Sequence, residues 1–382
     1  MKTCTLALAI LASLAAPFAA AQSTQSLDPV AEQSIKTADP VAQDTAARAA
    51  PVDPFVLFHL TGYTDATYVN AQGDAGSSGH FTLAPIFHVQ FGDRVLVEAE
   101  LEMAINDRGV TETGWEYAAV NVLLNDNAAL VVGKFLSPVG YFFPNQHPSW
   151  INKMAAPPPG FGHGGAAPSS DVGVQLRGGK TFANGQHINY AVYNGNGPRL
   201  GLEDMADLNL DTNGKTRNPD GKRVTGGRLG WMPIPTLELG ASVARGDIVL
   251  DPGTGFGSEP SRSYAVDGFD AAWRPTKSLD LRGEWIRQKV GEAPGSMVPD
   301  KGLWRAWFVQ GAYRFGAEKW EAVLRHGDSV STHAEATLKQ TAIGLNYLGL
   351  HHAVIKLNWE FNDSANAGAN ADRLLLQFAY GF

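Results

Sequence analysis

The feature that most limits how this chain can fold is a two-residue hydrophobic period that persists from residue 55 to residue 382. Residues 94–106, 351–363 and 371–382 show it most clearly, because apolar side chains alternate there with polar or small ones. Successive side chains of a β-strand point to opposite faces, so each stretch predicts a strand with one apolar face. The pattern predicts sixteen strands, at 55–70, 80–91, 94–106, 112–123, 128–135, 170–182, 186–195, 222–232, 236–246, 262–274, 277–290, 302–315, 318–329, 336–348, 351–363 and 371–382.

The lengths of these strands and of their connections favour a membrane barrel. Most segments reach the roughly ten residues that a tilted strand needs to cross a bilayer, whereas strands of soluble sheets average about five or six. Short turns, such as 91–94 and 125–128, alternate with longer connections rich in glycine, proline and polar residues. The sequence therefore predicts an all-β fold, a 16-stranded antiparallel transmembrane β-barrel with the short turns in the periplasm.

The N-terminal residues predict export. Lys2 precedes an apolar run from Leu6 to Phe18, which is followed by three alanines, and this order is typical of a signal peptide. We expect a cleaved signal peptide at 1–21, a periplasmic leader at 22–54 that is flexible or a short helix, and the barrel at 55–382. The only cysteine, Cys4, lies in the signal peptide. A formal net charge of -8 argues against a nucleic-acid partner.

One connection, residues 136–169, has an unusual composition and carries a family resemblance. It follows the motif Gly-Lys-Phe at 133–135 and contains a Pro-x-Gly turn at 138–140 and the segment His-Pro-x-Trp-Ile-Asn-Lys at 147–153; the chain ends in LLLQFAYGF. In these stretches it resembles the outer-membrane porins, and most closely the phosphate-selective porin O/P family. The resemblance implies a homotrimer and a third loop, 136–169, that folds inward and narrows the channel. The expected constriction residues are Lys153, His147, Trp150 and Asn152.

The two-residue period also selects side chains that should line the channel. The basic candidates are Arg177, Arg228, Arg282, Arg325 and Lys356, and the acidic ones are Glu98, Glu100, Glu102, Asp280, Glu284 and Glu360. Opposed charges around a pore imply a transverse field and weak selectivity. Lys153 is the only charged residue between Gly140 and Gly165, so we expect a modest bias toward anions.

Two motifs suggest more specific chemistry, a metal site and a hydrolase. His147 and His163 could form a metal pair, but they are separated by sixteen positions on an irregular loop without a nearby Asp, Glu or Cys, so we expect no metal and no cofactor. The motif HGDSV at 326–330 is similar to a serine-hydrolase block, yet it lies at a strand end without a strand-to-helix elbow. An outer-membrane barrel enzyme, phospholipase-like, is one alternative function; a barrel scaffold for a partner protein is another.

Taken together, these features predict a porin rather than an enzyme. The chain should form a water-filled channel in the outer membrane of a Gram-negative bacterium and should conduct small ions and hydrophilic solutes passively. Its outer face should contact membrane lipid and lipopolysaccharide.

Overall fold

The computed structural model describes residues 55–73, 76–106, 108–203, 207–251, 253, 259–332, 337–366 and 369–382. The signal peptide predicted at 1–21 and the leader predicted at 22–54 lie outside the described residues. Among the residues that are described, no helix is long and apolar enough to cross a membrane.

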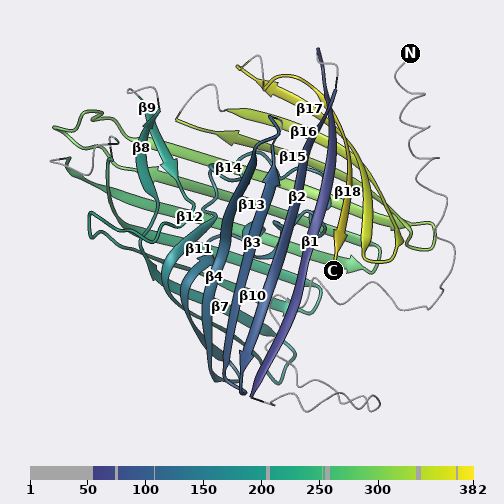
Figure 1. Cartoon of the computed structure of the whole chain (residues 1–382), viewed down its shortest axis with the longest axis horizontal. Helices are drawn as coiled ribbons and strands as arrows, with labels where there is room; N and C mark the ends of the chain where they lie inside the picture. The colour runs from purple at the N-terminus through teal and green to yellow at the C-terminus, as the bar shows by residue number, and fades with distance from the viewer. Residues whose placement is uncertain are drawn as a thin grey trace. The chain divides into compact units, whose positions relative to one another are not determined.

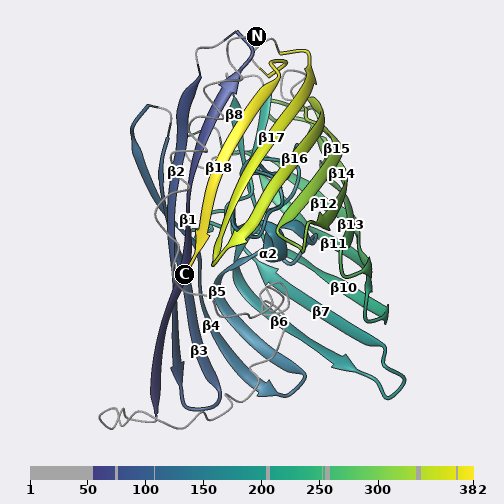
Figure 2. The same ribbon diagram turned by 90° about the vertical axis from the view of Figure 1, so that its right-hand side faces the viewer.

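Sixteen strands form one closed antiparallel barrel, in which each strand pairs with its neighbour and β1 pairs with β18 (Figures 1 and 2). The barrel strands are β1 (Val56–Ala71), β2 (Ser77–Phe91), β3 (Val95–Ile105), β4 (Thr111–Asn125), β5 (Ala128–Leu136), β6 (Ser170–Thr181), β7 (His187–Gly195), β10 (Val224–Ile234), β11 (Leu237–Val249), β12 (Ser261–Thr276), β13 (Leu279–Val290), β14 (Gly302–Phe315), β15 (Trp320–Val330), β16 (Leu338–Leu350), β17 (Ala353–Ser364) and β18 (Arg373–Gly381).

The predicted 16-stranded barrel is confirmed, and each predicted strand corresponds to an observed one with ends that differ by a few residues. The sequence reading missed a separate two-stranded sheet, β8 (Arg199–Glu203) and β9 (Asp207–Asp211). These short strands lie in the connection between β7 and β10, where the flanking glycine, proline and aspartate residues are typical of a loop. Leu200, Leu208 and Leu210 nevertheless follow period two and are buried.

The two faces of the barrel wall differ in chemistry. Large apolar side chains on the outer face are exposed, as Leu229, Leu324 and Ile343 show. Their sequence neighbours on the inner face include buried polar groups such as Arg228 and Arg325. A soluble protein rarely exposes an apolar surface of this extent, whereas a membrane barrel presents it to lipid.

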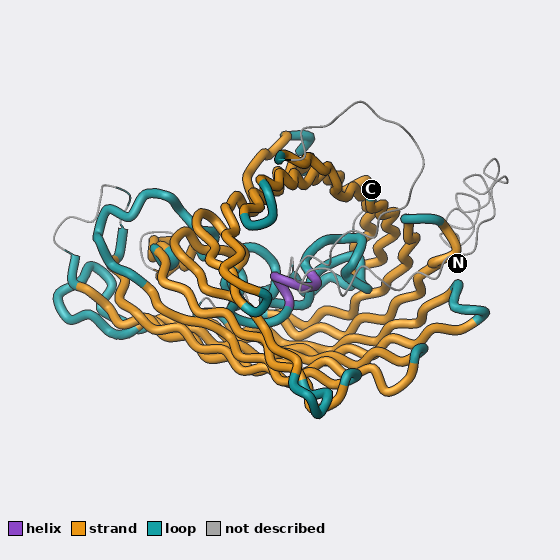
Figure 3. Tube along the Cα trace, turned by 90° about the horizontal axis from the view of Figure 1, so that it is seen from below, coloured by secondary structure: helices purple, strands orange, loops and turns teal. Residues whose placement is uncertain are grey.

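The connection between β5 and β6 contains the only helix among the described residues, α2 (Phe142–Gln146). Figure 3 shows α2, in purple, surrounded by the orange strands. Residues 137–169 are called the Gly/Pro segment below. The two ends of this segment meet, because the Ser137 N–H donates to the Ser169 carbonyl at 2.9 Å.

Candidate functional site

The Gly/Pro segment packs its aromatic side chains against the inner face of the barrel. Phe142 and Phe161 are both buried, with ring centroids 5.8 Å apart. The ring of Phe308, on β14, lies 5.0 Å from Phe161 and 6.2 Å from Phe142. The same apolar cluster includes Val266 and Ile286. Burial of these groups stabilises the segment against β12, β13 and β14 through the hydrophobic effect.

Polar groups of the wall hold the start of the segment. The Gly140 N–H donates to Ser242 Oγ at 3.0 Å, and the Phe142 N–H donates to Glu284 Oε2 at 2.9 Å. Gly140 has a φ of +91°, and a Cβ at this position would lie 2.2 Å from Glu284 Oε1. Only glycine therefore fits here. Glu284, predicted as a channel-lining acid, is buried and accepts the first helical N–H of α2.

Lys153 is paired rather than free. Its Nζ donates to Glu321 Oε2 at 2.6 Å, and its side chain is 14% exposed. The amide of Asn346 donates both to the Lys153 carbonyl, at 2.9 Å, and to Glu321 Oε1, at 3.1 Å. The single charge of the segment is thus largely neutralised by the wall, a contact between residues 168 positions apart that the sequence alone did not suggest.

Two of the predicted basic lining residues donate to the backbone of the segment. Arg325 reaches the Ala156 carbonyl at 2.9 Å and the Pro157 carbonyl at 3.2 Å. Lys356 donates to the carbonyl of Ser149 and to the carbonyl of Met154, the latter at 3.3 Å. Because both cations are buried, their role in this structure is to fasten the segment to β15 and β17.

Two other arginines predicted to face the channel, Arg228 and Arg282, are paired with carboxylates. Arg228 donates to Asp270 at 2.5 and 2.9 Å and to Glu238 at 2.9 Å, and all three are buried. Arg282 donates to Asp280 at 2.6 and 2.8 Å. The predicted acid Glu360 accepts from Arg373 at 2.5 and 3.0 Å and lies 3.7 Å from Arg325. These charges form local ion pairs.

Arg177 differs, since its side chain is 47% exposed. It donates to Asn121 Oδ1 at 2.9 Å and lies 3.5 Å from Glu98 Oε2. Glu100, on β3, is buried and accepts from the hydroxyl of Tyr63, on β1, at 2.9 Å. Among the predicted basic residues, Arg177 therefore offers the most accessible charge.

Trp150 and Asn152 pack against or bond to other groups of the protein. The Trp150 ring packs closely against Gly381, on β18. A Cβ at position 381 would lie 3.0 Å from the nearest ring atom. Asn152 is buried; its Oδ1 accepts the Met154 N–H at 3.2 Å and its Nδ2 donates to the Ala156 carbonyl at 3.3 Å. Both residues thus help to set the path of the segment.

His147 and His163 lie together, with their Nε2 atoms 3.2 Å apart. The expectation that they lack an acidic neighbour is wrong, because Glu116 Oε1, on β4, lies 3.3 Å from His163 Nε2 and 3.8 Å from His147 Nε2. Glu102, on β3, belongs to the same cluster. Burial lowers the pKa of His147 to about 3, and burial also lowers the pKa of His163. Both imidazoles are therefore neutral at physiological pH.

The motif HGDSV does not assemble a nucleophile and a base. His326 and Ser329 both lie on β15, whose pairing with β14 and β16 has no register shift. Residues three apart on such a strand face opposite sides of the wall. His326 contacts Thr341 Oγ1 at 2.8 Å, whereas Ser329 lies on the inner face beside Gly160.

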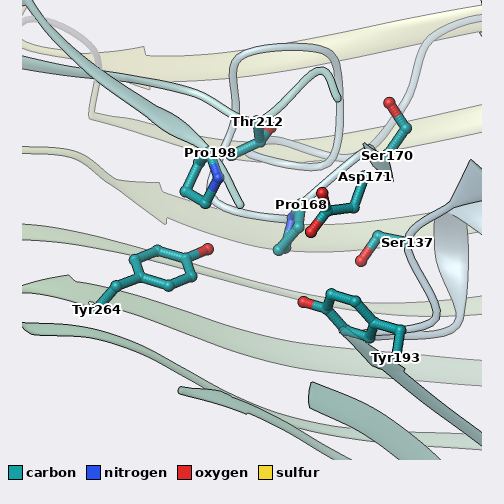
Figure 4. A pocket seen from close by; sticks show the side chains of 8 residues that line it. All are labelled: Ser137, Pro168, Ser170, Asp171, Tyr193, Pro198, Thr212 and Tyr264. Atoms are coloured by element: carbon teal, nitrogen blue, oxygen red, sulfur yellow. The ribbon is translucent and has the colours of Figure 1, made fainter. Parts of the chain in front are cut away.

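A small recess lies at the end of the Gly/Pro segment (Figure 4). Its cavity volume is about 10 Å³, which is room for no more than about one water molecule. The carboxylate of Asp171 accepts the Gly197 N–H at 3.1 and 3.2 Å and the Val172 N–H at 2.7 Å. The recess is thus too small for a solute.

Solved outer-membrane channels share this fold. The outer membrane channel DcaP of Acinetobacter baumannii superposes with a TM-score of 0.56 at 11% identity, covering 88% of this chain and 100% of that one. The anion-selective porin from Comamonas acidovorans gives a TM-score of 0.55 at 14% identity, over 86% and 100%. OmpT of Vibrio cholerae, in a trimer form, gives 0.54 at 10% identity, over 86% and 99%. No protein-family model and no curated protein matches the sequence.

Proposed function

We propose that the chain is an outer-membrane porin, a water-filled channel for the passive diffusion of small ions and hydrophilic solutes, and not an enzyme. The observation that carries this proposal is the closed 16-stranded barrel, whose outer face exposes apolar side chains while its inner face carries many polar and charged groups. A barrel of this size is wide enough to enclose an aqueous channel. The apolar outer face fits outer-membrane lipid and lipopolysaccharide.

The Gly/Pro segment is proposed as the constriction of this channel. Its hydrogen bonds reach side chains of β11, β13, β15, β16, β17 and β18, all directed toward the same side of the wall. A segment held in this way would narrow the aqueous cross-section.

Conductance across a planar bilayer tests the proposal. Purified protein, without the signal peptide predicted at 1–21, should insert and give a steady current that is linear in voltage. A homotrimer, as the trimer form of the Vibrio OmpT suggests, should close in three equal steps. Protein that migrates as a folded, heat-modifiable barrel on gels but gives no current would refute the channel.

An anion preference is the finer part of the proposed function. It is supported by the exposed guanidinium of Arg177 and by the selectivity that the name of the Comamonas porin states. We propose no phosphate selectivity, because Arg228, Arg282 and Arg325 each donate to carboxylates or carbonyls of the protein.

Arg177→Glu should shift the reversal potential in a salt gradient toward cation selectivity, since it replaces an exposed positive charge with a negative one. Lys301→Glu is the matched control: it makes the same charge change at an exposed site between β13 and β14. Equal shifts in both variants, or none in Arg177→Glu, would remove Arg177 from the selectivity of the channel.

A further inference from the structure

The cluster of His147, His163, Glu116 and Glu102 has the dimensions of a metal site. In a tetrahedral zinc site with bonds of about 2.0–2.2 Å, neighbouring ligand atoms lie roughly 3.4 Å apart. The two imidazole Nε2 atoms and Glu116 Oε1 form a triangle with sides of 3.2, 3.3 and 3.8 Å. Glu102 offers a further carboxylate oxygen within 4.8 Å of one ring nitrogen of each histidine. The four residues thus present two nitrogen and two oxygen ligands.

An unpartnered polar atom points into this cluster. Glu116 is 6% exposed, and within the described part of the chain its Oε1 has no hydrogen-bond partner. Buried polar atoms in native proteins are almost always satisfied, so an orphaned carboxylate oxygen indicates a missing partner. A hydrogen bond between the two imidazoles is the competing arrangement, but it leaves Glu116 Oε1 without a donor.

A β-bulge aims Glu116 into the barrel. The pairing of β3 with β4 shifts register between Glu100 and Leu101, whose partners are Tyr117 and Trp115, so Glu116 is the extra residue. Trp115 and Val120 are both exposed on the outer face although they are five positions apart, which a regular strand would not allow. Bulges often reorient a side chain near functional sites in this way.

The surroundings of the imidazoles fit a bound ion. Phe143 is buried and packs against both rings, with centroids 5.2 Å from His147 and 5.7 Å from His163. The side chain of His163 is 42% exposed, which leaves a route from water to the cluster. Imidazole nitrogen with carboxylate oxygen is a ligand set that suits zinc, whereas calcium and magnesium prefer oxygen ligands alone.

We infer that His147, His163 and Glu116, with Glu102 as the fourth ligand, form a zinc site that ties the Gly/Pro segment to β3 and β4. Hydrogen bonds hold the segment to β11, β13 and β15–β18, on other parts of the wall. An ion at this cluster would anchor the segment to the remaining side. Zinc binding itself does not depend on the proposed channel function.

Zinc titration of the whole protein tests the inference. Tag-free protein in detergent, stripped with EDTA and dialysed, should bind about one Zn²⁺ per chain by calorimetry and by elemental analysis. His147→Ala/His163→Ala should abolish this binding, and Glu116→Gln should weaken it at least tenfold. The control is His351→Ala/His352→Ala, which removes the adjacent histidine pair in the β16–β17 connection and should leave the stoichiometry unchanged.

Two results would overturn the inference: stripped wild-type protein that takes up no Zn²⁺, or a folded His147→Ala/His163→Ala variant that retains one equivalent. Heat-modifiable migration on gels reports whether that variant is folded. If it is not, Glu116→Gln decides, because the substitution preserves size and replaces the charged carboxylate by a neutral amide. Unchanged zinc affinity in folded Glu116→Gln would exclude Glu116 as a ligand and the site as drawn.

Discussion

Replacement of residues 139–167 by a short Gly/Ser linker is expected to raise the single-channel conductance severalfold. The segment places a buried aromatic cluster and a run of hydrogen-bonded backbone against the inner wall, and its removal would leave that cross-section to water. A short linker can bridge the gap, because Ser137 and Ser169 are already hydrogen-bonded at 2.9 Å. The wall groups that lose their partners, such as Glu284 and Arg325, would then be hydrated by channel water.

The matched control for this deletion replaces residues 292–299, in the connection between β13 and β14, with the same linker. Glu292 and Met297 in that connection are exposed, so its loss should change the conductance little. The measurement is single-channel current in a planar bilayer, for variants that show heat-modifiable migration. An unchanged conductance after removal of 139–167 would exclude the segment as the constriction.

Arg325→Met is expected to lower the free energy of unfolding by about 3 kcal/mol, because removing one partner of a buried charge network strands the others. The change takes the donor from the carbonyls of Ala156 and Pro157 and leaves Gln340 Oε1 and Glu360 with one contact fewer. The urea midpoint of unfolding, followed by tryptophan fluorescence in detergent, measures the loss.

Arg305→Met on β14 is the control, since Arg305 is exposed and the same substitution there should stay within about 0.5 kcal/mol. The double variant Arg325→Met/Glu360→Gln should be less destabilised than the sum of the single variants. Each substitution removes the buried charge that the other substitution alone would leave without a partner. Equal midpoints for Arg325→Met and Arg305→Met would mean that Arg325 does not hold the segment.

The barrel could be predicted from the sequence because its signals are local. Strand period and turn length are properties of neighbouring residues, and they were enough to find all sixteen barrel strands. The β8–β9 pair escaped because its strands are five residues long and embedded in turn-forming residues. Short strands give too few alternations for the period to stand out.

The contacts of the Gly/Pro segment could not be predicted in the same way. Lys153 is the only charge between Gly140 and Gly165, but its partner Glu321 lies 168 positions further along the chain. The period placed Arg325 and Lys356 among the channel-lining residues, yet it gave no sign that the segment would use them as donors. The direction of a side chain follows from its position in the strand. Its hydrogen-bond partner depends on which distant segments the closed barrel brings together.

The acidic neighbours of His147 and His163 could not be predicted either, for a third reason. Their acidic neighbours come from two strands that precede the segment, and Glu116 faces inward only because of the bulge opposite Glu100 and Leu101. A count of alternating residues passes over a bulge, so the sequence gives no warning that Glu116 belongs to the inner face.

The anchoring of the Gly/Pro segment to late strands sets an order of assembly. The Ala155 N–H bonds to Asn358 Oδ1, 203 positions downstream, and its carbonyl accepts from Gln377, 222 positions downstream. These bonds cannot form until β17 and β18 are in place, and contacts so distant in sequence are slow to form. During biogenesis these bonds can therefore form only when the wall is nearly complete, which makes the docking of this part of the segment a late step of maturation.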